Sequence, residues 1–197
     1  LSNACFTIAL RTRLDLEIPC QVGTCQPRKA SGAICGEALD AKGKHARDCR
    51  WGGWIVKKHN AIVEELGTWC EFYGARIEKE VALPWSNPLH PEARIDLVVH
   101  LPGQGPLYVD VTIVSALSQT AIRKGSAVTN GATCEIAATA KRHTYPRISV
   151  VPFAVEQHGR FGEEALAFLR KVAPLDPALR PIALNSIYQT VSTLVQR

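Results

Sequence analysis

The sequence predicts an α/β fold with one compact core, and three observations support this prediction. Residues 54–73 repeat apolar side chains every three or four positions, which is the period of an amphipathic helix. Residues 76–83, 94–101 and 107–114 read as strands, and a Gly/Pro-rich turn joins the last two as a hairpin. An Ala-rich helical segment at 132–145 separates these strands from a fourth one. The predicted order is therefore helix, three strands, helix, strand and a further helix.

The composition is that of a globular protein. The chain has 197 residues, of which 46% are hydrophobic and 21% charged, so it is long and apolar enough to form one good core. No apolar run reaches the length of a transmembrane helix, and we expect no membrane partner. A net charge of +5 permits a polyanionic partner without requiring one. Because the chain begins at Leu1 and contains no Met, we expect it to be a domain of a longer polypeptide.

The N-terminal region predicts a helix followed by a loop. Residues 4–18 place apolar side chains on one helical face, and Pro19 ends the helix. Residues 20–34 are loop-like, with two glycines and a proline. The chain has seven cysteines, an odd number. Cys70 lies within a helical pattern and Cys35 and Cys49 bracket a histidine, which favours metal binding over a disulfide framework and indicates a reducing compartment.

The segment that follows predicts a small zinc knuckle. Cys35 precedes a glycine in a tight turn, and His45 and Cys49 have the spacing that puts two ligands on one face of a short helix. A structural zinc site takes four ligands, so one more has to reach in across the loop, and we favour Cys25 over Cys20. The alternative is a set of unrelated thiols and a surface histidine.

The helix predicted at 54–73 begins with a polar cluster, Lys57-Lys58-His59-Asn60. Two cations, an imidazole and an amide near a helix N-terminus could hold a phosphate group. An equally good interpretation is a solvated first turn.

The second half of the chain alternates loops with regular elements. A proline-rich loop covers 84–92, and a polar, glycine-punctuated loop with a helical turn around Lys124 covers 115–129. A strand is predicted at 147–156, where a proline suggests the edge of a sheet. The C-terminal elements are a helix at 163–172, a linker at 173–181 and a final helix at 182–195.

Two carboxylates lie among apolar residues of the predicted hairpin. An ionised Asp96 or Asp110 in a buried strand costs several kcal/mol unless it is paired or binds a metal. On paired strands the two could hold one Mg²⁺, with Glu80 or Glu78 of the preceding strand completing the shell or holding a water molecule. Lys141 on the next helix could activate a water molecule or neutralise developing charge. Such a group of residues suits metal-assisted hydrolysis of a phosphodiester.

Each of these residues also has an ordinary interpretation. Asp96 and Asp110 could face solvent, or pair with Arg94 or Lys79. Lys141 lies in the last turns of its helix, where a cation is favoured by the helix dipole.

Short motifs along the chain resemble, in their order, those of one protein family. They are Arg11-Thr12-Arg13-Leu14, Cys35-Gly36 with His45 and Cys49, Lys58-His59-Asn60, Arg94-Ile95-Asp96, Val109-Asp110-Val111-Thr112, Lys141 with Tyr145, and Val151-Pro152-Phe153-Ala154-Val155-Glu156 with Gly159. This set resembles the restriction-like endonuclease region at the C-terminus of site-specific non-LTR retrotransposon proteins, which follows a reverse transcriptase and a zinc knuckle. The resemblance extends from about Phe6 to Ala173.

The resemblance implies a PD-(D/E)XK restriction-endonuclease-like core with an N-terminal zinc knuckle and C-terminal helices. It implies a metal-dependent DNA endonuclease that nicks target DNA, so that the exposed 3′ end primes reverse transcription. The implied cofactors are Mg²⁺ or Mn²⁺, and Zn²⁺. The implied partners are DNA, the reverse transcriptase of the same polypeptide and the element RNA, and the implied location is the nucleus. The corresponding domains are 1–51 for helix and knuckle, 52–173 for the endonuclease core, and 174–197 for the linker and last helix.

The resemblance also assigns roles to individual residues. Asp96 and Asp110 take the first and second metal-ligand positions, and Lys141 stands where the family often has its lysine, with Tyr145 one turn later. Cys25, Cys35, His45 and Cys49 are the implied zinc ligands. Lys58, His59 and Asn60 match the family's basic-His-Asn motif beside the active site. Lys57, Arg94 and Lys124 are further candidate DNA contacts, which the family motifs do not assign.

The chain departs from the family pattern at two places. Thr112 rather than a lysine follows Asp110 by two positions, so the lysine has to come from elsewhere, and Lys124 competes with Lys141 for this role. The first cysteine of the knuckle is displaced. These departures leave two alternatives to an active nuclease: a catalytically inactive nucleic-acid-binding module on a nuclease fold, and a structural zinc domain that mediates protein contacts.

Overall fold

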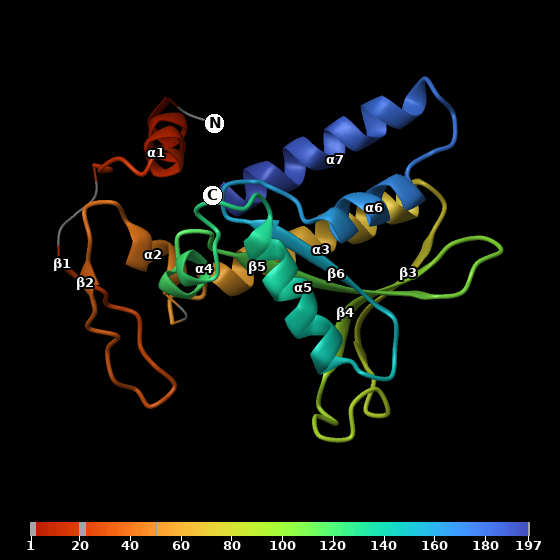
Figure 1. Cartoon of the computed structure of the whole chain (residues 1–197), viewed down its shortest axis with the longest axis horizontal. Helices are drawn as coiled ribbons and strands as arrows, with labels where there is room; N and C mark the ends of the chain where they lie inside the picture. The colour runs from red at the N-terminus through yellow and green to blue at the C-terminus, as the bar shows by residue number, and fades with distance from the viewer. Residues whose placement is uncertain (1–2, 20–22, 50, 197) are drawn as a thin grey trace. The chain divides into compact units, whose positions relative to one another are not determined.

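The computed structural model of the chain describes residues 3–19, 23–49 and 51–196, which divide into two compact units (Figure 1). The first unit takes the described residues up to Lys58 together with Gln196, and the second takes His59–Val195. The division falls within helix α3 (Trp54–Phe72).

The first unit consists of a helix and a small hairpin followed by one short helix. Its elements are α1 (Asn3–Arg13), β1 (Gly23–Thr24), β2 (Ala38–Leu39) and α2 (Lys44–Asp48). The helix expected at 4–18 is therefore shorter than predicted, because Asp15 adopts a left-handed backbone conformation with φ of 52°. The described part of 20–34, predicted as a loop, begins instead with a strand, since β1 pairs antiparallel with β2.

The second unit contains a mixed four-stranded sheet. Its strands are β3 (Arg76–Ala82), β4 (Arg94–His100), β5 (Leu107–Val114) and β6 (Val150–Glu156), in the order β3-β4-β5-β6. The first three strands are antiparallel, which confirms the predicted β4–β5 hairpin, and β6 runs parallel to β5. The predicted edge position of β6 is also confirmed. Pro152, which has no N–H to donate, is tolerated there.

Helices α3, α6 (Glu163–Val172) and α7 (Leu179–Gln196) form one hydrophobic core with the sheet. The largest fully buried side chains of this core include Leu66 of α3, Phe153 of β6 and Ile187 of α7. The connection between β5 and β6 contains the short α4 (Gln119–Arg123) and the longer α5 (Ala132–Thr144). A second, smaller cluster around Tyr145 lies at the end of α5. The fold is therefore α/β, with a helix preceding the sheet and helices flanking it, as predicted.

The final helix begins three residues earlier than the predicted start at 182. Its first turn is stabilised by Asp176, whose Oδ1 accepts hydrogen bonds from the N–H groups of Ala178 at 2.8 Å and Leu179 at 3.4 Å. Pro181 lies in this first turn, where the missing N–H costs little. Pro181 therefore belongs to the helix, whereas the sequence pattern had placed it in a linker at 173–181. In the described part of the chain, no helix has both the length and the apolar character needed to cross a membrane.

Candidate active site and metal centre

The strand register brings Asp96 and Asp110 to one position across the β4–β5 hairpin. Leu97 pairs with Val109, so the next position along the two strands places Asp96 opposite Asp110. Both residues are buried, with 9% and 3% of their surface exposed. The N–H of Val111 donates to Asp96 Oδ2 at 2.6 Å, so this carboxylate lies between the two strands and accepts a bond that the partner strand would otherwise take.

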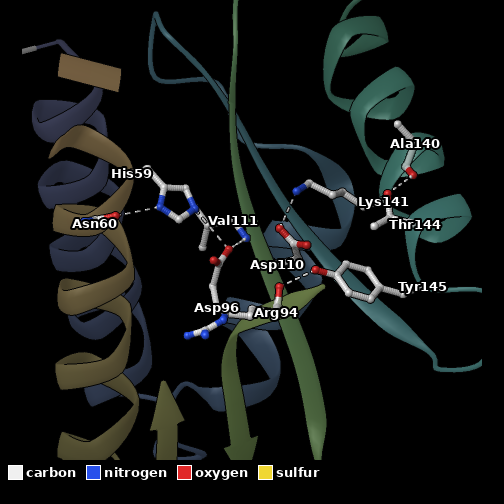
Figure 2. A network of polar contacts seen from close by, with 10 residues as sticks. All are labelled: His59, Asn60, Arg94, Asp96, Asp110, Val111, Ala140, Lys141, Thr144 and Tyr145. Atoms are coloured by element: carbon white, nitrogen blue, oxygen red, sulfur yellow. Dashed lines mark hydrogen bonds and ion pairs between the residues drawn. The ribbon is translucent and has the colours of Figure 1, made fainter. Parts of the chain in front are cut away.

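His59 of α3 is the second partner of Asp96 (Figure 2). Its Nε2 lies 3.2 Å from Asp96 Oδ2, and its Nδ1 lies 3.2 Å from the side-chain oxygen of Asn60. The hydrogen bond to Asp96 raises the pKa of His59 to about 9, although burial of the ring acts in the opposite direction. The imidazole is therefore protonated at neutral pH and donates to Asp96.

Lys141 of α5 is the partner of Asp110. Its Nζ lies 2.7 Å from Asp110 Oδ1. Burial raises the pKa of Asp110 above its ordinary value, and the Lys141 ammonium acts against this increase. Figure 2 shows the two carboxylates between His59 on one side and Lys141 on the other. The site thus combines two buried acids and two cations from a helix, a hairpin and a second helix.

Tyr145 closes the site where α5 ends. Its hydroxyl donates to the main-chain carbonyl of Arg94 at 2.5 Å, which ties the end of α5 to the start of β4 (Figure 2). Burial raises the pKa of Tyr145, and the nearby Asp110 carboxylate raises it further. The phenol therefore stays protonated and keeps its role as a donor.

The two candidate glutamates of β3 have different environments. Glu80 lies opposite Asp96, in the interval between the pairs Lys79–Leu97 and Val81–Ile95, and its backbone is left-handed with φ of 52°. Such strain in a strand costs about 1–3 kcal/mol and is typical of functional sites. Glu78 instead forms surface ion pairs with His100 at 2.8 Å and Arg76 at 3.2 Å. Of the two, the register aligns Glu80 with the Asp pair.

The other predicted cations lie elsewhere. Lys124 lines a pocket of about 650 Å³ together with Arg160, between the start of α5 and the β6–α6 connection. The Lys57 ammonium lies 4.9 Å from the ring centroid of Trp54. Lys79, considered as a partner of the Asp pair, forms an ion pair with Glu64 at 2.5 Å.

The contact between His59 and Asp96 was not foreseen, because the sequence suggested a phosphate contact for His59. The helical period contained a signal for it. His59 lies four residues after Ile55 and three before the fully buried Ile62, so it shares the face of α3 that turns toward the sheet. A histidine on that face needs a buried polar partner, and the two strand carboxylates are the acids that the hairpin places within the sheet.

The metal centre of the first unit contains the predicted ligands. The ligand atoms of Cys25, Cys35, His45 and Cys49 all lie within 4.8 Å of one another. The sulfurs of Cys25 and Cys49 are 3.4 Å apart, those of Cys35 and Cys49 are 3.9 Å apart, and Cys35 Sγ lies 3.5 Å from His45 Nε2. A tetrahedral zinc ion with bonds of about 2.3 Å has ligand–ligand edges of about 3.8 Å. The four residues could therefore bind a metal such as zinc.

The hairpin of the first unit positions two of these ligands. The Cys25 N–H donates to Glu37 O at 2.8 Å, and the Gly36 N–H donates back to Cys25 O at 3.0 Å. Gly36 has φ of 74°, which L-residues rarely adopt, so the turn after Cys35 requires glycine. The fourth candidate ligand, Cys25, thus lies directly after β1, on the opposite side of the hairpin from Cys35. The alternative, Cys20, lies outside the described residues.

Two thiols of this cluster have pKa values that are shifted in opposite directions. Burial raises the pKa of Cys25 to about 12, and the neighbouring Cys49 and Cys35 thiols act in the same direction. Although burial opposes it, hydrogen bonds from the backbone of Trp51 and from Cys25 lower the pKa of Cys49 to about 7. Thiolate is the form of cysteine that binds metal, so a metal at this cluster would be held by deprotonated thiols.

Comparison with protein-family models found no match to the chain, and comparison with curated proteins found none either.

Proposed function

We propose that this chain is a metal-dependent DNA endonuclease domain of the PD-(D/E)XK type, belonging to a site-specific non-LTR retrotransposon protein. The observation that carries the proposal is the alignment of Asp96 and Asp110 across two paired strands, with Lys141 in direct contact with Asp110. Two buried acids and a lysine at one point of a sheet have the chemistry that phosphodiester hydrolysis needs.

The donor groups fit a hard divalent cation such as Mg²⁺ or Mn²⁺. Asp96 and Asp110 would hold it, because such cations prefer carboxylate oxygens. The raised pKa of Asp110 supports this fit. Burial disfavours the ionised carboxylate, and a nearby positive charge such as a bound cation would stabilise it. A bound cation would polarise the phosphate and lower the pKa of a water molecule.

The protein's own side chains position these acids and supply further charge. His59 and the Val111 N–H both donate to Asp96 Oδ2, which fixes the orientation of that carboxylate. The Lys141 ammonium beside Asp110 can hold the attacking water or neutralise charge that develops on the phosphate. Lys141 thereby takes the role of the lysine that the family pattern expects in place of Thr112. Glu80 can complete the group of acids from the strand on the other side of β4.

A plasmid-nicking assay with Mg²⁺ or Mn²⁺ tests this function. Asp96→Asn and Asp110→Asn remove one charge each with little change in size, and we expect each to slow nicking at least about a hundredfold. DNA affinity, measured without catalytic metal, should stay within a few fold of the wild type. Glu65→Gln, on the exposed surface of α3, is the matched control and should nick normally. Normal nicking by both Asp variants would refute the assignment.

Thr112 favours a second candidate, a nucleic-acid-binding module that has lost catalysis. It predicts that the wild-type protein binds DNA and shows no metal-dependent cleavage. A third candidate, a structural zinc domain for protein contacts, predicts no DNA affinity even at low salt, where phosphate contacts bind best. The same binding and nicking experiments distinguish all three.

The biological setting rests on the sequence resemblance. We propose that nicking by this domain primes reverse transcription by the reverse transcriptase of the same polypeptide, with the element RNA as template. Because the target is chromosomal DNA, the proposed location is the nucleus.

A further inference from the structure

We propose that the loop between β3 and β4, residues 83–93, is a DNA wedge whose exposed Trp85 and Leu89 contact base faces beside the phosphodiester to be cleaved. The proposal rests on the endonuclease function proposed above and adds a contact surface to it. The way the loop is held, the side chains it exposes and the charges around it support this proposal.

The loop is closed on itself by polar groups. The Leu83 N–H donates to Ala93 O at 3.2 Å across its base. The hydroxyl of Ser86, which is fully buried, donates to Leu83 O at 2.7 Å. Asn87, 5% exposed, accepts a hydrogen bond from the Leu89 N–H at 2.9 Å through Oδ1. Three prolines restrict the backbone further, so the loop has a defined shape.

The loop is also fixed to the active-site end of α5. The Asn87 side-chain amide donates to Thr144 O at 2.9 Å. Arg147 donates from its N–H to Ser86 O at 3.3 Å and from its guanidinium to Trp85 O at 3.4 Å. Thr144 precedes Tyr145, which holds the start of β4. The loop and the Asp pair are therefore parts of one rigid framework.

This framework leaves two large apolar side chains in solvent. Trp85 is 51% exposed and Leu89 is 85% exposed, although the residues between them include the buried Ser86 and Asn87. Buried polar groups hold the backbone while apolar groups point outward, which is the reverse of the usual arrangement. An exposed tryptophan and leucine on a rigid loop suit a partner with flat apolar faces.

The charges around the loop favour nucleic acid as that partner. Arg94 follows the loop directly, Arg147 is bonded to it, and both are exposed. The one acidic residue of the loop sequence, Glu92, lies 3.5 Å from His90. Arginines bind phosphates, aromatic rings stack on bases, and leucine-type side chains wedge between base steps.

The distance along β4 relates the wedge to the scissile bond. Arg94 precedes Asp96 by two residues, about 7 Å of extended strand, which equals about two base steps of duplex DNA. Because the loop joins β4 at Arg94, the base of the loop lies within a few base steps of a phosphate bound at the Asp pair.

The experiment measures binding of the full chain to a fluorescein-labelled duplex by anisotropy, without added catalytic metal. Trp85→Ala and Leu89→Ala should each weaken binding at least roughly fivefold, with an unchanged salt dependence because no phosphate contact is lost. Trp85→Phe keeps an aromatic face and should bind within about twofold of wild type. Leu175→Ala, at a residue that is 90% exposed outside the loop, is the matched control and should bind normally.

A duplex carrying 2-aminopurine near the nick provides a second readout. Base unstacking raises its fluorescence with the wild type, and Trp85→Ala should abolish that increase. Wild-type affinity and fluorescence in both alanine variants would overturn the wedge while leaving the endonuclease intact. Altered self-association, measured by light scattering, with unchanged DNA binding would overturn it in favour of a contact between copies of the chain. A wild-type protein that binds no duplex at low salt would overturn both proposals, and normal melting temperatures confirm that each variant is folded.

Discussion

Asp110 is the residue whose environment most constrains the chemistry of the site. It is 3% exposed and its neighbours include a second acid, so without a cation its carboxylate would be strongly disfavoured. Lys141 provides that cation at 2.7 Å from α5, and it lies more than twenty residues after the end of the hairpin in sequence. The sequence could place Asp110 on a buried strand, but the reach of a long side chain from another element depends on how α5 packs. Lys124 was an open alternative for this reason.

Substitution of the two candidate lysines separates their roles. We expect Lys141→Met to slow nicking by about 10²–10³-fold, the usual effect of removing one charged group that stabilises a transition state. Lys124→Met, at a residue that lines a separate pocket, should retain nearly full activity. Single-turnover nicking of a supercoiled plasmid measures both. Equal losses in the two variants would contradict the assignment of Lys141.

A third buried acid, Glu156 at the end of β6, makes stability depend on pH. Burial raises its pKa, and Arg160 at 3.8 Å only partly opposes this. Because the folded-state pKa is raised, folding favours the protonated carboxyl of Glu156. The stability that this form provides is fully present below the ordinary glutamate pKa, and it is lost as the pH rises through the folded-state pKa. Glu156→Gln cannot lose a proton, so the variant should gain stability relative to wild type as the pH rises from about 4, near the ordinary glutamate pKa, towards neutral. Urea unfolding across this range measures the difference, and a constant difference would contradict the shift.

At the scale of elements, the hairpin was predictable because its pattern is local. Alternating apolar residues and a Gly/Pro turn define β4 and β5, and the register then follows from the turn. The role of His59 was less accessible, since a helix face can be read from its period but its neighbour across the sheet cannot. The left-handed backbone of Glu80 had no signal in the sequence, because glutamate is not a residue that favours this conformation.

The Tyr145 phenol links the end of α5 to the start of β4 by a hydrogen bond. Tyr145→Phe removes the donor to Arg94 O, and we expect a loss of about 1 kcal/mol in the free energy of unfolding. Nicking should stay within roughly tenfold of wild type if Tyr145 positions α5 rather than reacting. Urea unfolding and the plasmid assay measure the two effects, with Tyr188→Phe as the control for loss of a hydroxyl. A much larger loss of nicking at unchanged stability would instead assign Tyr145 a catalytic role.

At the scale of the whole molecule, the two units depend on different interactions. The second unit has a continuous hydrophobic core from α3 to α7, whereas the buried apolar cluster of the first consists of three cysteines. The sequence indicated three ligands of the candidate metal centre through their spacing. The fourth, Cys25, required the hairpin pairing of β1 with β2, which two-residue strands do not reveal in advance.

Removal of zinc should therefore affect the first unit selectively. We expect the purified chain to contain about one zinc per molecule, and its chelation to expose the amides of residues 23–49, because metal binding supplies about 10–16 kcal/mol in small zinc domains. The amides of β4 and β5 should keep their protection, since none of the four ligands belongs to the core around them. Hydrogen–deuterium exchange with and without chelator measures both regions, and Cys49→Ser should reproduce the chelated pattern. Cys134→Ser, at a buried cysteine outside the cluster, is the control and should leave residues 23–49 protected. Equal protection of those residues before and after chelation would show that the hairpin is stable without metal.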